Sequence, residues 1–162
     1  MSDFSVLSDP NQAGRRFQDS VMVALLPTTS YWCAQDLPHM TLVYAGTTAD
    51  LPPTTFNELG KVALEISFQY TPIVTDVLGT DTFGGGADDN PMVDVLLLRP
   101  VEEFLQMRML LESWNASEHP FTPHVTVGPI GSGQDTTPDA LMFDRIMVAW
   151  GPEHLTFPLR LT

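Results

Sequence analysis

Two short stretches with nearly the same sequence constrain the fold of this chain more than any other feature. One is Leu-Pro-His-Met-Thr-Leu-Val at 37–43, and the other is Thr-Pro-His-Val-Thr-Val-Gly at 122–128. Each places a proline before a His-x-Thr triplet and continues as an apolar run typical of a β-strand. Because side chains alternate between the two faces of a strand, each stretch is expected to present its histidine and threonine on one face and core side chains on the other.

The four polar residues of these motifs, His39, Thr41, His124 and Thr126, are the candidate catalytic residues. Cleavage of a phosphodiester needs a base that takes a proton from the nucleophile and an acid that protonates the leaving oxygen. Histidine does either near neutral pH. Threonine hydroxyls can donate hydrogen bonds to the non-bridging phosphate oxygens, which carry charge in the transition state. Brought together, the two strands predict metal-free acid–base chemistry on a phosphate, and the sequence leaves open which histidine is the base.

The other two histidines are not expected to take part. His154 and Thr156 form a third His-x-Thr match, but no proline precedes it and only eight residues follow His154. His119 lies before Pro120 in the approach to the second motif and is expected on a surface loop. The proline and the position in the chain therefore separate the two motifs from a chance match.

Apolar patterns around the motifs indicate further strands and two helices. Besides the motif strands, they indicate strands at 21–26, 73–83, 92–98, 143–150 and 154–161, and helices at 54–68 and 101–115. The strand at 73–83 is expected to bend at Gly79. The first helix can be capped by Thr54 or Thr55, with Glu58 as the capping-box partner.

The glycine-rich stretch at 84–91 is the clearest loop and lies near the midpoint of the chain. We expect residues 1–20 to form a flexible N-terminal arm. Residues 21–162 are expected to form a single domain whose two lobes meet near 84–91.

The charge balance argues against long nucleic acids as partners. The chain has 20 acidic and 7 basic residues, a formal net charge of −13, and only one lysine, Lys61. Nucleic acids bind largely through Lys and Arg, so a small anionic ligand fits this balance better. An acidic surface that only keeps the protein soluble explains the charge equally well. The single cysteine, Cys33, fits a reducing compartment, and we find no membrane span or leader, so a cytoplasmic location is expected.

The twin motifs, Pro-His-Met-Thr-Leu and Phe-Thr-Pro-His-Val-Thr-Val, resemble those of the 2H phosphoesterase superfamily. This superfamily includes LigT-like RNA 2′,3′-cyclic phosphodiesterases and phage enzymes that degrade cyclic-nucleotide immune signals of the CBASS type. The resemblance covers about residues 20–160. It implies a bilobal α+β fold with two antiparallel sheets flanking a central groove, helices outside, and both His-x-Thr pairs lining the groove. It implies hydrolysis without a metal or a cofactor.

The acidic charge favours a small cyclic nucleotide or cyclic oligonucleotide as the substrate, and a phage enzyme would act in the host cytoplasm. The alternatives are an RNA 2′,3′-cyclic phosphodiesterase and a module that sequesters a nucleotide without cleaving it. A metal site formed by His39, His119 and His124 is a further alternative. Phe83 and Trp150 are candidates for stacking a nucleobase, although either can equally belong to the core. The oligomeric state is left open.

Overall fold

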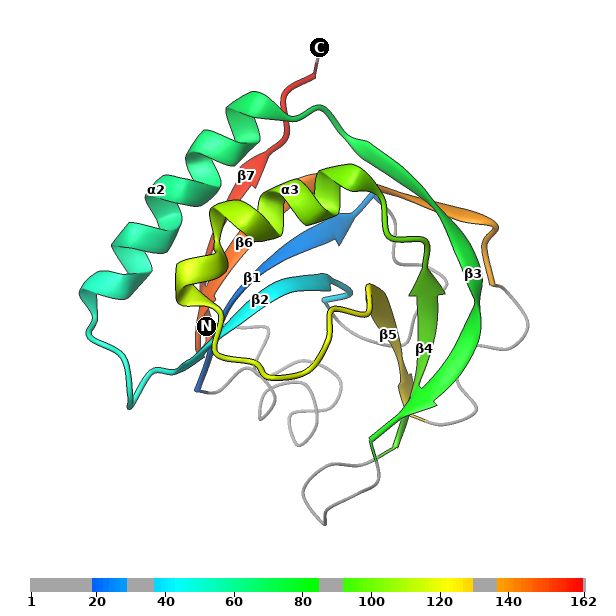
Figure 1. Cartoon of the computed structure of the whole chain (residues 1–162), viewed down its shortest axis with the longest axis horizontal. Coiled ribbons are helices and arrows are strands. Elements are labelled where there is room, and N and C mark those ends of the chain that lie inside the picture. Colours follow the sequence, from blue (N-terminus) through cyan, green and yellow to red (C-terminus); the bar gives the residue numbers. More distant parts are fainter. Residues whose placement is uncertain (1–18, 29–36, 85–91, 130–136, 162) are drawn as a thin grey trace.

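The structure is a computed structural model, and it describes residues 19–28, 37–84, 92–129 and 137–161 (Figure 1). Most of the predicted N-terminal arm (1–18) and of the predicted lobe boundary (85–91) lies outside the described residues. The elements, in chain order, are β1 (Ser20–Pro27), β2 (Met40–Thr47), α2 (Thr54–Gln69), β3 (Ile73–Phe83), β4 (Val93–Leu98), α3 (Glu102–Leu110), the 3-10 turn η3 (Glu112–Trp114), β5 (His124–Pro129), β6 (Ala140–Trp150) and β7 (Glu153–Pro158). The predicted α+β class is confirmed.

The seven strands form one antiparallel sheet in the order β2-β1-β6-β3-β4-β5, with β7 paired to β6. The expected arrangement of two separate sheets is not confirmed, because β3 belongs to both halves. Its first residues pair with β6, and its later residues pair with β4. The bend predicted at Gly79 lies where the register of β3 against β4 shifts, and Gly79 has φ 154°, a value that L side chains rarely adopt.

The two motif strands are at opposite ends of this strand order, yet they lie next to each other. Strong curvature of the sheet brings β2 and β5 together, with Cα atoms of the two strands within 8 Å (Figure 1). The two ends of the strand order therefore lie side by side in space. This arrangement, which no local sequence pattern encodes, brings the two His-x-Thr motifs together.

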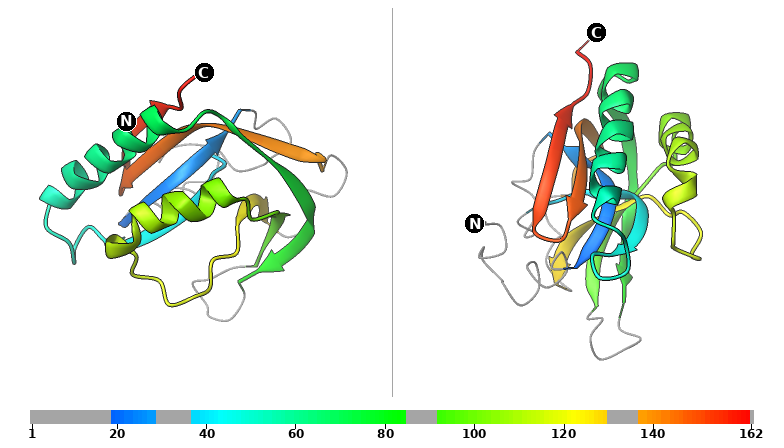
Figure 2. Two further views of the ribbon diagram at one scale, coloured as in Figure 1. Left: turned by 45° about the horizontal axis from the view of Figure 1, so that its top comes forward. Right: turned by 90° about the vertical axis from the view of Figure 1, so that its left-hand side faces the viewer.

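Both helices cover the same face of the sheet (Figure 2). Along β1, alternate residues Val21, Val23 and Leu25 face the helices and join a core with side chains of α2, α3, β2, β5 and β6. The intervening residues Met22, Ala24 and Leu26 face the opposite side and form a second, smaller apolar cluster with Met147 and Ala149 of β6. The sheet is thus apolar on both faces near β1, which explains the continuous apolar run at 21–26.

Two local features of the helices differ from expectation. Helix α2 has Pro53 as its N-cap residue with no side-chain cap hydrogen bond, so the predicted capping box is not formed. Helix α3 ends at Leu110 and is followed by η3, so the single helix predicted over 101–115 is split. Among the described residues, no helix is long and apolar enough to cross a membrane.

Candidate active site

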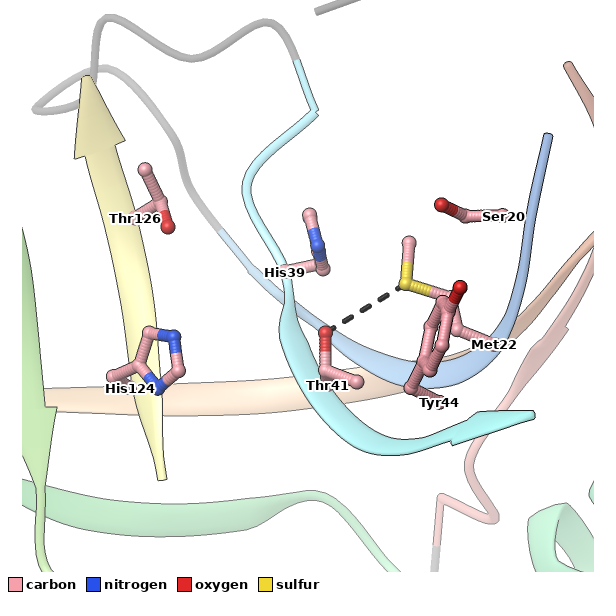
Figure 3. Close-up of a pocket in the computed structure, with 7 residues that line it drawn as sticks. All are labelled: Ser20, Met22, His39, Thr41, Tyr44, His124 and Thr126. Carbon is pink, nitrogen blue, oxygen red and sulfur yellow. Dashed lines mark hydrogen bonds between the residues drawn. The ribbon is translucent and has the colours of Figure 1, made fainter. Parts of the chain in front are cut away.

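A pocket of about 210 Å³ opens on the sheet face opposite the helices (Figure 3). It is lined by residues of β1, of β2 with the residue before it, and of β5. These are Ser20, Met22, His39, Thr41, Tyr44, His124 and Thr126. All four residues singled out by the two motifs are therefore brought into one pocket, although the two histidines are 85 residues apart in the chain (124 − 39).

The alternation of each motif strand explains this placement. In β2 the intervening residues Met40 and Leu42 are 0% exposed in the core, and in β5 Val125 and Val127 are equally buried. The pleat then directs the histidine and threonine of each motif to the other face. Buried apolar neighbours thus fix the direction of the polar side chains, and the face predicted from the sequence is confirmed.

Both motif histidines are held by the same local hydrogen bond. Nδ1 of His39 lies 2.9 Å from the carbonyl oxygen of Leu37, and Nδ1 of His124 lies 2.7 Å from that of Thr122. A carbonyl oxygen only accepts, so Nδ1 must carry the proton and donate in each case. Nε2 is the nitrogen in each ring that does not bind this carbonyl.

The proline of each motif lies between the histidine and the carbonyl that orients it. Pro38 and Pro123 hold a restricted φ and favour extended backbone in the residue before them. This arrangement presents the carbonyl two residues before each histidine to its own ring, at the distances given above. The proline that distinguishes these motifs from the third His-x-Thr match therefore has a structural role in the site.

The Thr41 hydroxyl is aimed at a weak acceptor. Its Oγ1 donates to the thioether sulfur of Met22 at 3.6 Å (Figure 3). A phosphate oxygen is a much better acceptor than a thioether, so this hydroxyl can turn to a phosphate at little cost. Among the described residues that line the pocket, none is Lys, Arg, Asp or Glu, and the polar side-chain groups that these residues offer are imidazoles and hydroxyls.

The two aromatic candidates have different surroundings. The ring of Phe83 meets that of His124 edge-on, with centroids 4.8 Å apart, so it borders the motif histidine without lining the pocket. Trp150 stacks on Phe56 of α2 at 6.0 Å and packs against the helix-side core. Phe83 is therefore brought to the site and Trp150 is not.

Sequence reasoning missed three lining residues: Ser20, Met22 and Tyr44. Ser20, expected in the N-terminal arm, instead begins β1, where it pairs with Thr47 of β2. Met22 lies within a continuous apolar run, in which no pattern indicates which side chains face a ligand. No local signal indicates Tyr44, because under strict alternation a residue five positions after His39 lies on the opposite face of the strand.

The third His-x-Thr match lies on β7, away from the pocket lining. His154 pairs with Ala149 of β6, and burial lowers the pKa of its imidazole below the ordinary value of 6.5. His119 is exposed.

In the part of the chain that the structure describes, no three His, Cys, Asp or Glu side chains are placed to hold a metal ion, so the three-histidine metal site is not formed there.

The lowered pKa of His154 gives a testable dependence of stability on pH. The unfolded chain takes up the proton more readily than the folded one, so the free energy of unfolding has its full value above about pH 6.5 and falls as the pH drops below it. We expect His154→Gln to lose less stability than the parent between about pH 7.5 and pH 5, measured by urea denaturation. His119→Gln is the exposed control and should follow the parent. If His154→Gln lost as much unfolding free energy as the parent over this pH range, groups other than His154 would cause the pH dependence.

The sequence matches no protein-family model and no curated protein. The structure, in contrast, resembles several solved ones. Usb1 of Kluyveromyces marxianus has a TM-score of 0.59 at 12% identity, with 88% of this chain and 98% of that chain covered. The protein TT0787 of Thermus thermophilus has a TM-score of 0.54 at 12% identity, with 87% and 95% covered. A crystal structure described as a phosphoesterase has a TM-score of 0.51 at 17% identity, with 88% and 96% covered.

These similar structures belong to the 2H phosphoesterase superfamily. At such identities the likeness shows the fold alone, and it agrees with the expectation from the twin motifs. The chain has the fold of the 2H phosphoesterases, with both of its His-x-Thr motifs in a single pocket.

Proposed function

We propose that this protein is a phosphodiesterase that hydrolyses a small cyclic nucleotide or cyclic oligonucleotide without a metal ion. The observation that carries the proposal is the shared pocket of His39, Thr41, His124 and Thr126, with Nδ1 of each imidazole tied to a backbone carbonyl. Two proton-exchanging nitrogens and two hydroxyl donors are what the hydrolysis of a phosphodiester requires.

In the proposed reaction, Nε2 of one histidine takes a proton from a water molecule as its oxygen forms a bond to phosphorus. Nε2 of the other histidine gives a proton to the leaving oxygen as the old phosphorus–oxygen bond breaks. The hydroxyls of Thr41 and Thr126 donate to the non-bridging oxygens, which carry the charge of the transition state. For Thr41 this means exchanging the sulfur of Met22 for a phosphate oxygen.

The similar structures support this proposal. One of them is a phosphoesterase, and a structure of Kluyveromyces marxianus Usb1 contains uridine monophosphate. The pocket volume of about 210 Å³ is below the roughly 300–1,000 Å³ of clefts that enclose a drug-sized ligand. It suits one nucleotide unit of a substrate better than a folded RNA. Degradation of a CBASS-type immune signal is the biological role that we propose for such a reaction.

The proposal is tested by incubating the protein in EDTA with a panel of cyclic mono-, di- and trinucleotides and separating the products. We expect product to accumulate well beyond one equivalent per protein for at least one member of the panel. Ligand that is bound and then recovered intact after denaturation would identify a sequestering module instead. Activity that disappears in EDTA and returns with Zn²⁺ would overturn the metal-free mechanism.

Substrate size gives a further prediction. With a net charge of −13, the protein should repel a long RNA at low salt, where charges are least screened. We expect kcat/KM for the best cyclic nucleotide to exceed that for a tRNA-length 2′,3′-cyclic phosphate by at least about tenfold, or ~1.4 kcal/mol. The comparison uses the same buffer at low and at high ionic strength. The ratio of the two kcat/KM values should decrease as salt is added, because salt screens the repulsion of the long RNA. A long RNA end that is the better substrate at low salt would establish the RNA 2′,3′-cyclic phosphodiesterase instead.

A further inference from the structure

The pocket extends beyond the motif residues onto a second surface, formed by Ser20 and Met22 of β1 and Tyr44 of β2 (Figure 3). Met22 and Tyr44 are cross-strand partners, so their side chains lie next to each other. Tyr44 is 36% exposed, whereas Met22 is 5% exposed. The surface is therefore an exposed aromatic ring beside a buried thioether, with the Ser20 hydroxyl at its edge.

Irregularities in the pairing of β2 bring Tyr44 to this face. The register against β1 shifts between Val23 and Ala24, so that Val23 lies opposite Val43 and Ala24 lies opposite Thr41. One extra residue in β2, Leu42, reverses the alternation beyond it. Val43 is consequently buried in the helix-side core, and Tyr44 shares the pocket face with Thr41. A bulge that turns an aromatic ring toward a polar pocket and leaves it exposed is typical of a binding site.

The chemistry of this surface differs from that of the motif half of the pocket. The motif half offers imidazoles and hydroxyls to an anion, whereas the second surface offers an aromatic face, a thioether and one hydroxyl. A flat, neutral, aromatic group that also has polar edges fits it, and an additional phosphate does not. Thr41 and Tyr44 are three residues apart on β2, roughly 10 Å of strand, which is a span that one nucleoside unit can fill.

We propose that Ser20, Met22 and Tyr44 form the subsite that binds the nucleobase next to the phosphate being cleaved. The base stacks on the ring of Tyr44, Met22 forms the floor, and the Ser20 hydroxyl hydrogen-bonds to the edge of the base. Base–aromatic stacking is tolerant of base identity, so this subsite selects a nucleotide over a phosphodiester without a base. This inference rests on the proposed function for its substrate and on the phosphate site for its anchor.

The test compares Tyr44→Ala and Tyr44→Phe on two substrates: the best cyclic nucleotide of the panel and glycerol cyclic phosphate, which has no base. For Tyr44→Ala we expect kcat/KM to fall at least about tenfold on the nucleotide, mainly through KM, and by no more than about threefold on the base-free diester. Tyr44→Phe keeps the aromatic face and should stay within about threefold on both. Phe68→Ala, which removes an exposed aromatic ring of α2, is the matched control and should behave as the parent.

Equal losses on the two substrates would overturn the subsite, because they would mean that Tyr44 supports the catalytic half of the pocket. No loss on either substrate would overturn it as well. A binding measurement separates this inference from the proposed function. By calorimetry, a nucleoside monophosphate should bind the parent more tightly than inorganic phosphate does, and Tyr44→Ala should remove that difference even if the parent hydrolyses nothing. The same difference in parent and variant would contradict the subsite.

Discussion

Replacing His124 with alanine is expected to lower kcat by about 10²- to 10⁴-fold, the usual cost of losing a positioned acid or base. His124 is only partly buried and its ring hydrogen-bonds to the carbonyl of Thr122, so little of the fold depends on it. The melting temperature should stay close to that of the parent.

His39→Ala should lose activity to a similar degree. Because His39 is only 8% exposed, the removal of its side chain should lower the free energy of unfolding more than the removal of His124. Initial rates on the cyclic nucleotide and thermal melting by circular dichroism measure both effects.

The two histidines should act as a unit. The double variant should therefore lose little more activity than the worse single variant, instead of the product of the two losses. His119→Ala, on an exposed residue away from the pocket lining, is the control and should keep the rate of the parent. A His39→Ala or His124→Ala protein with full activity would remove the motif histidines from the mechanism.

Thr126→Val should produce the second largest loss. Valine has nearly the shape of threonine but no hydroxyl, so the variant tests the donor without opening a cavity. Removal of one donor to a transition-state oxygen costs roughly 10²- to 10³-fold in kcat. KM should change much less, since the charge on the non-bridging oxygens is stabilised mainly in the transition state.

Thr156 offers a matched control for this substitution. It is the threonine of the third His-x-Thr match, it is exposed on β7, and it does not line the pocket. Thr156→Val should therefore be neutral in kcat and KM. A Thr126→Val protein that keeps its kcat and changes only KM would contradict the assignment, because the hydroxyl would then contribute to ground-state binding alone.

The sequence was sufficient to predict the strands, the first helix and the faces of the motif strands, but not the break between α3 and η3. Short-range alternation decides these, and the full burial of Met40, Leu42 and Val125 confirms it. The strand at Ile73–Phe83 and its irregularity at Gly79 were likewise predictable, because both depend on residues that are close together in the sequence. The pocket location of the four motif residues followed from the pairing of the two motifs together with the family resemblance.

The remaining parts of the site depend on long-range pairing. Strict alternation from Thr41 would direct Tyr44 toward the core, and only the register shift against β1 turns it to the pocket. Ser20 reaches the pocket because β1 extends one residue beyond the apolar run that defines it in the sequence. The continuity of the sheet through β3, and the approach of β2 to β5, are also tertiary features that periodicity does not encode.

The central claim, that two histidines exchange protons in one reaction, is tested most directly by the pH dependence of kcat/KM in the parent, His39→Ala and His124→Ala. The parent should give a bell-shaped profile with its maximum between roughly pH 5.5 and 8, because one imidazole must be neutral while the other is charged. Each variant should lose a different limb: loss of the limb at low pH identifies the base, and loss of the limb at high pH identifies the acid. Profiles in which both variants keep the two limbs of the parent would contradict the account.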